Sequence, residues 1–189
     1  MYLIRASLSS TRYAGRMSAS NDFLALRICV LTVSDTRTPD NDNSGDYLAA
    51  ALVDAGHHLH ERRIERDDRY RLRAVVANWI ADAGVNAVIV TGGTGFTGRD
   101  STPEAIMPLL DKEMPGFGEM FRHLSYAEIA TSTMQSRAFA GLSNDTFVFC
   151  LPGSTSACRL AWEKLLQPQL DSRTKPCNLP GLIPRLRER

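Results

Sequence analysis

The chain has 189 residues, a formal net charge of +1 at pH 7 and 43% hydrophobic residues, an ordinary globular composition and a length that suits one domain with a sizeable core. The balanced charge gives no general attraction to nucleic acid or to a membrane surface, and no apolar run approaches the roughly 18 residues that a membrane helix needs. The four cysteines are scattered without a CxxC pair, so we expect neither disulfides nor a cysteine metal site, and a cytoplasmic location fits.

The first two dozen residues are rich in serine and arginine, and Asp22 is their only acid. Such a composition resembles an organellar transit peptide, but it lacks the apolar core of a secretory signal. The alternatives are a disordered tail or a start upstream of the true initiator, for which Met17 is a candidate. We predict a disordered extension over residues 1–24, followed by an α/β domain over residues 25–170.

From Leu26 the elements alternate. Residues 26–34 form a near-continuous apolar, β-branched run, as expected of a strand buried on both faces. After a polar loop, a helical segment ends at Gly56, which is placed as a stop. The pattern then predicts a half-exposed strand over 58–64, an amphipathic helix over 71–84 that Asp67 and Asp68 open, and a third, buried strand at 86–93.

The second half has a less regular pattern. Residues 102–113 predict a helix that Pro108 should bend or break, and residues 114–142 look helical in two pieces. A fourth buried strand at 146–154 precedes a closing helix at 157–170, and residues 171–189 should form a tail across the surface. Strands that alternate with helices predict a three-layer α/β fold, with a mostly parallel, Rossmann-like sheet covered by helices on both faces.

Small and polar residues follow three of the predicted strands. The carboxyl ends of parallel strands lie at one edge of a sheet, where ligands bind. The three loops should therefore build one site. They contain Ser34 and Asp35, then Gly92, Gly93, Thr94 and Gly95, then Gly153 and Ser154.

The glycine loop matches the dinucleotide fingerprint GxGxxG at residues 93–98, but the context is wrong. That fingerprint should follow the first strand and should precede an acid about 20 residues later, at the end of the next strand. Here the loop follows the third strand, and Glu113 and Glu119 lie in helical sequence. A P-loop needs a lysine that is missing here. An NAD-dependent oxidoreductase remains possible only if the loop follows the first strand of the sheet.

A phosphate cradle is the reading that fits the loop. Glycines let main-chain amides approach phosphate oxygens, Thr94 and Thr97 add hydroxyl donors, and Arg99 adds a positive charge. The helix that starts at Thr102 would present its positive end to the same space. The competing explanation, a sharp turn that needs glycine, accounts for one or two of the glycines.

Asp100 is the unusual member of this loop, because a phosphate repels a carboxylate unless a cation lies between them. Asp100 is either an N-terminal helix cap or a magnesium ligand. Asp67 and Asp68, which follow the second predicted strand, either satisfy the next helix N-terminus or supply a further ligand.

The combined motifs resemble a known family. The segments GGTG-x₃-RD-x-TPEA, MPGFGE-x-FR and the later PGS triplet are similar to the MoaB/MogA family of molybdenum cofactor biosynthesis proteins. The resemblance runs from Leu26 to about Leu179. Stretches such as SYAEIATSTMQSRA resemble the MoaB branch in particular.

The resemblance implies a three-layer α/β domain that binds molybdopterin and, in active members, transfers AMP from Mg-ATP to its terminal phosphate. Asp100 then matches the family's essential aspartate, and Asp67 its second essential acid; both would hold Mg²⁺ and serve catalysis. The turn at Gly92–Gly95 would bind phosphate, with Glu119 and Arg137 as further candidates. The alternative is a non-catalytic protein that binds the pterin or acts as a scaffold in the same pathway.

The resemblance also implies partners. We expect molybdopterin and ATP as ligands, a homotrimer or homohexamer as the assembly, and contacts with other proteins of the molybdenum cofactor pathway. Nucleic acid and membrane are not expected.

Overall fold

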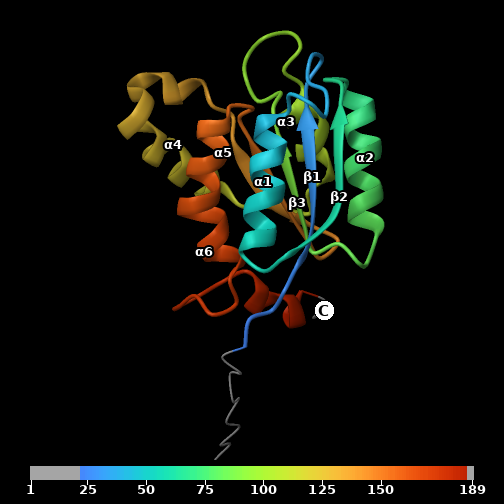
Figure 1. The fold of residues 1–189 in the computed structure, drawn as a ribbon, viewed down its shortest axis with the longest axis vertical. Helices are drawn as coiled ribbons and strands as arrows, with labels where there is room; N and C mark the ends of the chain where they lie inside the picture. The colour runs from blue at the N-terminus through green and yellow to red at the C-terminus, as the bar shows by residue number, and fades with distance from the viewer. Residues whose placement is uncertain (1–21, 187–189) are drawn as a thin grey trace, which may run out of the picture.

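The computed structural model describes residues 22–186, which form one six-stranded sheet with helices on both faces (Figure 1). The strand order is β2-β1-β3-β6-β5-β4. This three-layer α/β arrangement is the predicted fold class. The strands are β1 (Arg27–Val33), β2 (His58–Glu65), β3 (Ala87–Thr91), β4 (Lys112–Glu113), β5 (Phe139–Ser143) and β6 (Thr146–Leu151).

The four predicted strands run parallel and form the β2-β1-β3-β6 part of the sheet. Every residue of β3 and β6 is buried, which explains their continuous apolar sequence. β2 is an edge strand of mostly charged and polar residues with no fully buried position, a composition that discourages pairing with other chains.

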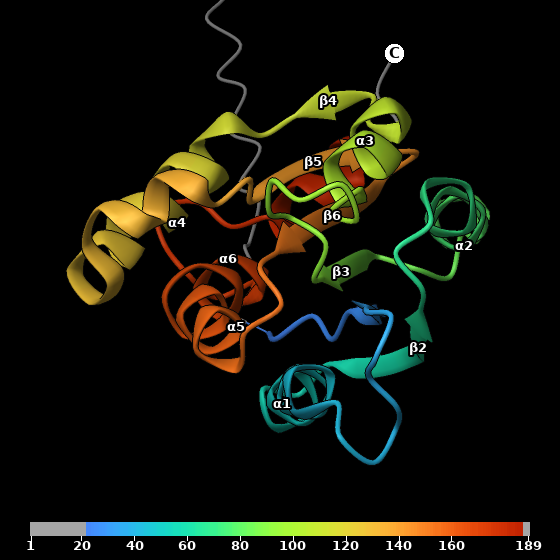
Figure 2. The ribbon, with the colours of Figure 1, turned by 90° about the horizontal axis from the view of Figure 1, so that it is seen from above.

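Helices cover both faces of the sheet, as the view from above shows (Figure 2). α1 (Asn43–Asp54), α4 (Pro115–Ile129) and the helix that begins with α5 (Thr155–Ala161) pack on one face. α2 (Arg69–Ala81) and α3 (Thr102–Ile106) pack on the other. Two separate hydrophobic cores result, and the sheet lies between them.

Two short antiparallel strands were not predicted. Residues 139–142 were expected to be helical, but they belong to β5, which pairs with β6. Lys112–Glu113, the end of the helix predicted at 102–113, pairs with β5 as β4. Asn144 and Asp145 both have positive φ angles of 43° and 68°, as a tight two-residue hairpin requires. The sequence signal was therefore the Asn-Asp pair, because the strand before it is too short to show a period of two.

The predicted helix breaks are present. Gly56 adopts a φ of 91° directly after α1, and α3 gives way at Met107–Leu109 to a 3-10 turn that contains Pro108. The closing helix runs through a π-helical stretch at Trp162–Leu166 into α6 (Gln167–Leu170). Because α3 has only five residues, its dipole contributes less to the loop before it than the sequence suggested.

The two ends of the described chain pack on each other. Residues 1–21 of the predicted disordered extension lie outside the described residues. Residues 22–24 were predicted to be disordered too, but the Leu24 amide donates to Ser172 Oγ at 2.8 Å and Arg173 stacks over Phe23. Residues 171–189 were predicted to form a tail across the surface, but Leu179 is buried in the hydrophobic core. None of the described helices is long and apolar enough to cross a membrane.

The core packing leads to a stability prediction for α1. Leu52 is fully buried against the sheet, whereas its neighbour Val53 is 52% exposed. We expect Leu52→Ala to lower the free energy of unfolding by about 2–5 kcal/mol, because it leaves a cavity in a close-packed core. Chemical denaturation measures this loss. Val53→Ala is the matched control and should change stability by less than about 0.5 kcal/mol; equal losses for both variants would contradict the observed packing.

Candidate functional site

A cavity of about 460 Å³ opens at the carboxyl edge of the sheet, beside the ends of β1, β3 and β6. The chain continues from β1 to β2 on one side and reaches β3 on the other, which makes this edge a topological switch point. The structure brings eight predicted site residues into the cavity wall. They are Ser34, Gly92, Gly93, Thr94, Gly95, Asp100, Gly153 and Ser154.

The glycine turn has a conformation that other residues would strain. Gly92 and Gly93 have φ angles of 103° and 63°, in the left-handed region that favours glycine. A Cβ atom on Gly92 would lie 2.2 Å from the Val33 carbonyl oxygen, and one on Gly93 would lie 2.5 Å from Thr102 Oγ1. These two glycines are therefore required by close packing as well as by the turn itself.

The carbonyl side of the turn is held by the protein. Thr102 is buried, its hydroxyl donates to the Gly92 carbonyl at 2.9 Å and its amide to the Gly93 carbonyl at 3.0 Å. Thr102 was predicted to bind phosphate, but its side chain does not line the cavity and instead fixes the turn. Among the residues described, no protein acceptor is bonded to the amide of Gly93 or Thr94, which leaves these donors for a ligand.

Asp100 turns back toward the glycine turn and lines the cavity. Its Oδ2 accepts from the Thr97 amide at 2.8 Å and from Thr97 Oγ1 at 2.6 Å. Partial desolvation raises its pKa, but these hydrogen bonds, with one from the Gly95 amide, outweigh that effect and hold the pKa of Asp100 below its ordinary value. Asp100 is therefore a firmly ionised carboxylate next to the phosphate-sized turn.

Asp67 follows β2 and reaches the same turn from behind. A Cβ atom on Gly93 would lie 2.6 Å from Asp67 Oδ2, and Asp67 Oδ1 accepts from the amide and the hydroxyl of Ser101. Desolvation raises the pKa of Asp67, the Ser101 hydrogen bonds oppose it, and the charges of Asp100 and Asp35 raise it further. The charge of Asp100 thus acts on the pKa of Asp67 across the turn.

These two carboxylates fit a hard divalent cation only in part. Within residues 22–186 no group of three or more His, Cys, Asp or Glu side chains is arranged to hold a metal ion. Mg²⁺ characteristically takes one or two protein carboxylates and completes its shell with water and substrate phosphates. Asp67 and Asp100 match that donor set, because their carboxylates lie beside Gly93 and Gly95 of the same turn.

Arg99 and Asp35 occupy the rim and pair with each other. Arg99 Nε lies 3.0 Å from Asp35 Oδ2, and Arg99 Nη2 lies 2.6 Å from Asp35 Oδ1. Neither side chain lines the cavity. Arg99, which was predicted to add a positive charge to the cradle, is paired with Asp35 in this structure, and its binding of phosphate stays a prediction.

Arg137, a further candidate, braces the loop from outside. Its guanidinium donates to the carbonyls of Gly95 at 2.8 Å and Asp100 at 2.9 Å, and it lies 5.2 Å from the centre of the Phe96 ring. It also forms an ion pair with Glu104. Glu119 is exposed on α4 and lines a separate small cavity, so it is not part of this site.

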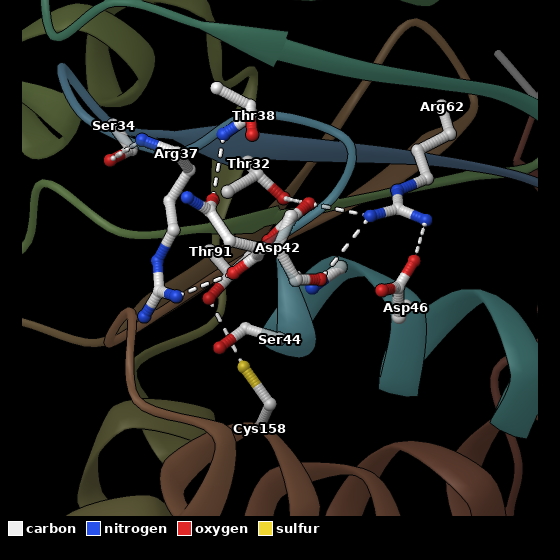
Figure 3. A network of polar contacts seen from close by, with 12 residues as sticks. Thr32, Ser34, Arg37, Thr38, Asp42, Ser44, Asp46, Arg62, Thr91 and Cys158 are labelled. Atoms are coloured by element: carbon white, nitrogen blue, oxygen red, sulfur yellow. Dashed lines mark hydrogen bonds and ion pairs between the residues drawn. The ribbon is translucent and has the colours of Figure 1, made fainter.

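Thr32 and Asp42, which line the cavity, belong to a polar network that the sequence did not predict (Figure 3). Asp42 is fully buried, caps α1 at the Gly45 amide, and accepts from Thr32 Oγ1 at 2.7 Å. Arg62, from β2, lies 2.7 Å from the same carboxylate and pairs with Asp46 as well. The available signal was an aspartate directly before a helix, the usual N-cap pattern.

Helix α4 and the 3-10 turn after it supply one wall of the cavity, which was also missed. Phe121 and Ile129 give apolar surface, while Ser125 and Glu128 give polar groups. On the opposite side, Thr91 Oγ1 lies 3.1 Å from the buried Cys158 sulfur and donates to the Pro152 carbonyl. Desolvation raises the pKa of the Cys158 thiol to about 11, so this cysteine is a packing group rather than a nucleophile.

A comparison of two glycines tests the turn. We expect Gly93→Ala to destabilise the protein by about 1–3 kcal/mol, because a side chain there meets Thr102 and Asp67 at a positive φ. Thermal unfolding monitored by circular dichroism measures the effect. Gly98→Ala is the control, since a Cβ atom at Gly98 has open space around it. A Gly93→Ala variant as stable as Gly98→Ala would show that the turn tolerates a side chain.

The raised pKa of Asp67 predicts a pH dependence. A carboxyl with a raised folded-state pKa holds its proton more tightly when folded, so its ionisation costs stability as pH rises from its ordinary pKa through the raised value. Asp67→Asn removes this cost. We therefore expect Asp67→Asn to gain stability relative to the unsubstituted chain as pH rises through that window, measured by urea denaturation. A difference that stays constant or shrinks with rising pH would contradict the shift.

Comparisons with known proteins agree with this architecture. Residues 29–172 match a family described as "Probable molybdopterin binding domain". The chain is 53% identical to molybdenum cofactor biosynthesis protein B of Escherichia coli K12 over 159 residues, which are 84% of this chain and 94% of the relative.

Solved structures are similar as well. A crystal structure of molybdenum cofactor biosynthesis protein B aligns with a TM-score of 0.75 and 44% identity, covering 78% of this chain and 92% of that one. The tungsten cofactor synthesizing protein MoaB of Pyrococcus furiosus aligns with a TM-score of 0.67 and 37% identity, covering 74% of this chain and 89% of that one.

The glycine loop of this chain follows β3, the third strand in sequence. The condition stated above for a dinucleotide-binding site, a loop that follows the first strand, is therefore not met.

Proposed function

The chain belongs to the molybdenum cofactor biosynthesis protein B family, and on that premise we propose that it binds molybdopterin and transfers AMP from Mg-ATP to the terminal phosphate of the pterin. The observation that carries the proposal is the position of two carboxylates, Asp67 and Asp100, on either side of a glycine turn with free amides. A carboxylate repels a phosphate, so acids beside a phosphate-binding turn favour a ligand only when a cation lies between them.

The cavity suits the pterin half of the reaction. Its apolar wall contains Phe121, Ile129 and Leu160, and its polar lining contains hydroxyls and main-chain groups. A flat heterocycle fits such a mixture of apolar surface and a few directional polar groups. The amides of Gly93 and Thr94 would then bind the terminal phosphate of the pterin at the bottom of the glycine loop.

The reaction is a displacement at phosphorus. A terminal phosphate oxygen of molybdopterin forms a bond to the α-phosphorus of ATP, and the bond from that phosphorus to the bridging oxygen breaks, so that pyrophosphate leaves with the electron pair. Such a transfer needs alignment and neutralisation of charge more than acid–base chemistry. When bound, Mg²⁺ supplies that neutralisation between the two anions.

The chain's own residues do the positioning. The Thr97 hydrogen bonds and the Ser101 hydrogen bonds fix the carboxylates of Asp100 and Asp67. Arg137 holds the loop that carries Asp100 through two carbonyls. Asp42 and Arg62 fix the start of α1 below the cavity, so that the β1–α1 loop keeps its place beside the ligand.

Further features support an assembled, cytoplasmic protein, as proposed from the sequence. Met120, Tyr126 and Met134 are large apolar side chains exposed on α4 and the following turn, and contact between copies in a homotrimer or homohexamer would cover such side chains. A reaction that consumes ATP belongs in the cytoplasm, where all four cysteines would stay free as they are here. Other proteins of the molybdenum cofactor pathway would then be partners.

A turnover assay tests the proposal. Purified chain with molybdopterin, ATP and Mg²⁺ should release pyrophosphate, and Asp100→Asn should lower the rate by about 10²–10³-fold, because it removes a charge that aligns the reactants. Removal of Mg²⁺ with a chelator should have a similar effect. Asp54→Asn, at the exposed far end of α1, is the control and should keep full activity.

The same assay separates the catalytic function from a scaffold. A scaffold would bind molybdopterin in calorimetry but release no pyrophosphate, whichever variant is used. No release, together with equal pterin affinity for Asp100→Asn and the unsubstituted chain, would refute AMP transfer and leave pterin binding as the function of this site.

A further inference from the structure

A second cavity, of about 660 Å³, lies next to the first, at the carboxyl end of the edge strand β2. Both cavities are lined by Ser34 and Arg37, so the β1–α1 loop forms the partition between them. The linings differ in chemistry. Five arginines line the second cavity: Arg37, Arg62, Arg63, Arg66 and Arg71. Among residues 22–186, Arg37 is the one arginine that lines the first cavity.

Several of these arginines are free to bind an anion. Arg62 is committed to the buried Asp42. Arg63 and Arg71 form long pairs of 3.5 and 3.4 Å with Glu61 and Glu65 and remain largely exposed; such pairs contribute little to stability and exchange easily.

Arg37 and Arg66 are held less strongly, because the Arg37 guanidinium donates to an uncharged group, the Asn41 carbonyl, at 2.5 Å. Within the described part of the chain, neither of them forms an ion pair. Guanidinium groups match phosphate oxygens in geometry as well as in charge. The second cavity therefore offers guanidinium groups, those of Arg37, Arg63, Arg66 and Arg71, that can donate hydrogen bonds to a phosphate.

A row of acids lies between the two cavities. Asp100 lines the first cavity and Asp35 lines the second. Asp67 stands between them, with its carboxylate beside Gly93 and its amide 3.4 Å from Asp35 Oδ1. The point where two anionic ligands would meet is thus the point where the carboxylates gather.

We propose that the arginine-lined cavity binds a polyphosphate chain. This assignment rests on the proposed function, under which the chain is the β- and γ-phosphates of ATP and the first cavity holds the pterin. The α-phosphorus then lies at the acid row, and pyrophosphate leaves toward the arginines, whose charge stabilises the electron pair that it carries away.

A double variant tests the site. Arg66→Gln with Arg71→Gln removes two charges from the cavity wall and leaves the buried Asp42–Arg62 pair intact. We expect the variant to bind inorganic tripolyphosphate and Mg-ATP about tenfold more weakly in calorimetry, because each lost guanidinium removes a charge-assisted contact. Molybdopterin affinity should not change. Glu65→Gln, which removes an acid that competes for Arg71, should strengthen tripolyphosphate binding.

Arg69→Gln is the matched control. Arg69 is exposed at the start of α2, the helix that carries Arg71, and it lines neither cavity. Its substitution therefore removes one positive charge, as a single substitution of Arg66 or Arg71 does, but leaves the cavity wall unchanged. If Arg69→Gln weakens tripolyphosphate binding as much as a single substitution of Arg66 or Arg71, the effect is general charge and the proposal is wrong. Unchanged binding by the double variant would also overturn it.

The outcomes keep the two proposals apart. If tripolyphosphate binding depends on the arginines but no AMP is transferred to molybdopterin, the polyphosphate site stands and AMP transfer fails. If AMP is transferred while the double variant binds Mg-ATP as the unsubstituted chain does, AMP transfer stands and the arginine site is refuted.

Discussion

The site depends on the close approach of three main-chain segments at the carboxyl edge of the sheet. The end of β1, the glycine turn after β3 and the loop after β6 touch without side chains between them: the space for a Cβ on Gly92 is filled by the Val33 carbonyl, and that on Gly153 by the Gly92 Cα at 3.2 Å. A side chain at either glycine would push the loops apart. The free amides of the turn, the carboxylates around it and the partition by the β1–α1 loop all follow from this contact.

The two carboxylates beside the glycine turn, those of Asp100 and Asp67, have pKa values shifted in opposite directions. Asp100 is stabilised as an anion by hydrogen bonds, whereas Asp67 is partly desolvated and lies near two other acids. Such an arrangement costs stability in the ligand-free protein. Functional sites commonly carry such a cost, because groups that must act on a ligand are not arranged to satisfy one another.

Arginine has two different tasks in this structure. Arg62, Arg99 and Arg137 are held by carboxylates or carbonyls and fix the loops around the cavity. Arg37, whose guanidinium donates to the Asn41 carbonyl, and Arg66 form no ion pair among the described residues, and both line the second cavity. Counting basic residues in the sequence does not separate these tasks, because a guanidinium is available to a ligand only when no carboxylate of the fold has already taken it.

The sequence by itself determined the parallel part of the sheet and the edge of the sheet at which the first cavity opens. The continuous apolar runs of β1, β3 and β6 are long enough to identify buried strands, and small residues directly after each run place three loops at one edge. The family, too, could be read from motifs, since turns that need glycine leave a local signature.

The tertiary structure alone decided which side chains face the cavity. Thr102 and Arg99 carry suitable donors, yet one is bonded to the turn and the other to Asp35. Asp42 and Arg62 meet across 20 positions of sequence, and β5 becomes a strand through its pairing with β6. Contacts of this kind depend on how elements distant in the chain pack together, and no local pattern of residues records them.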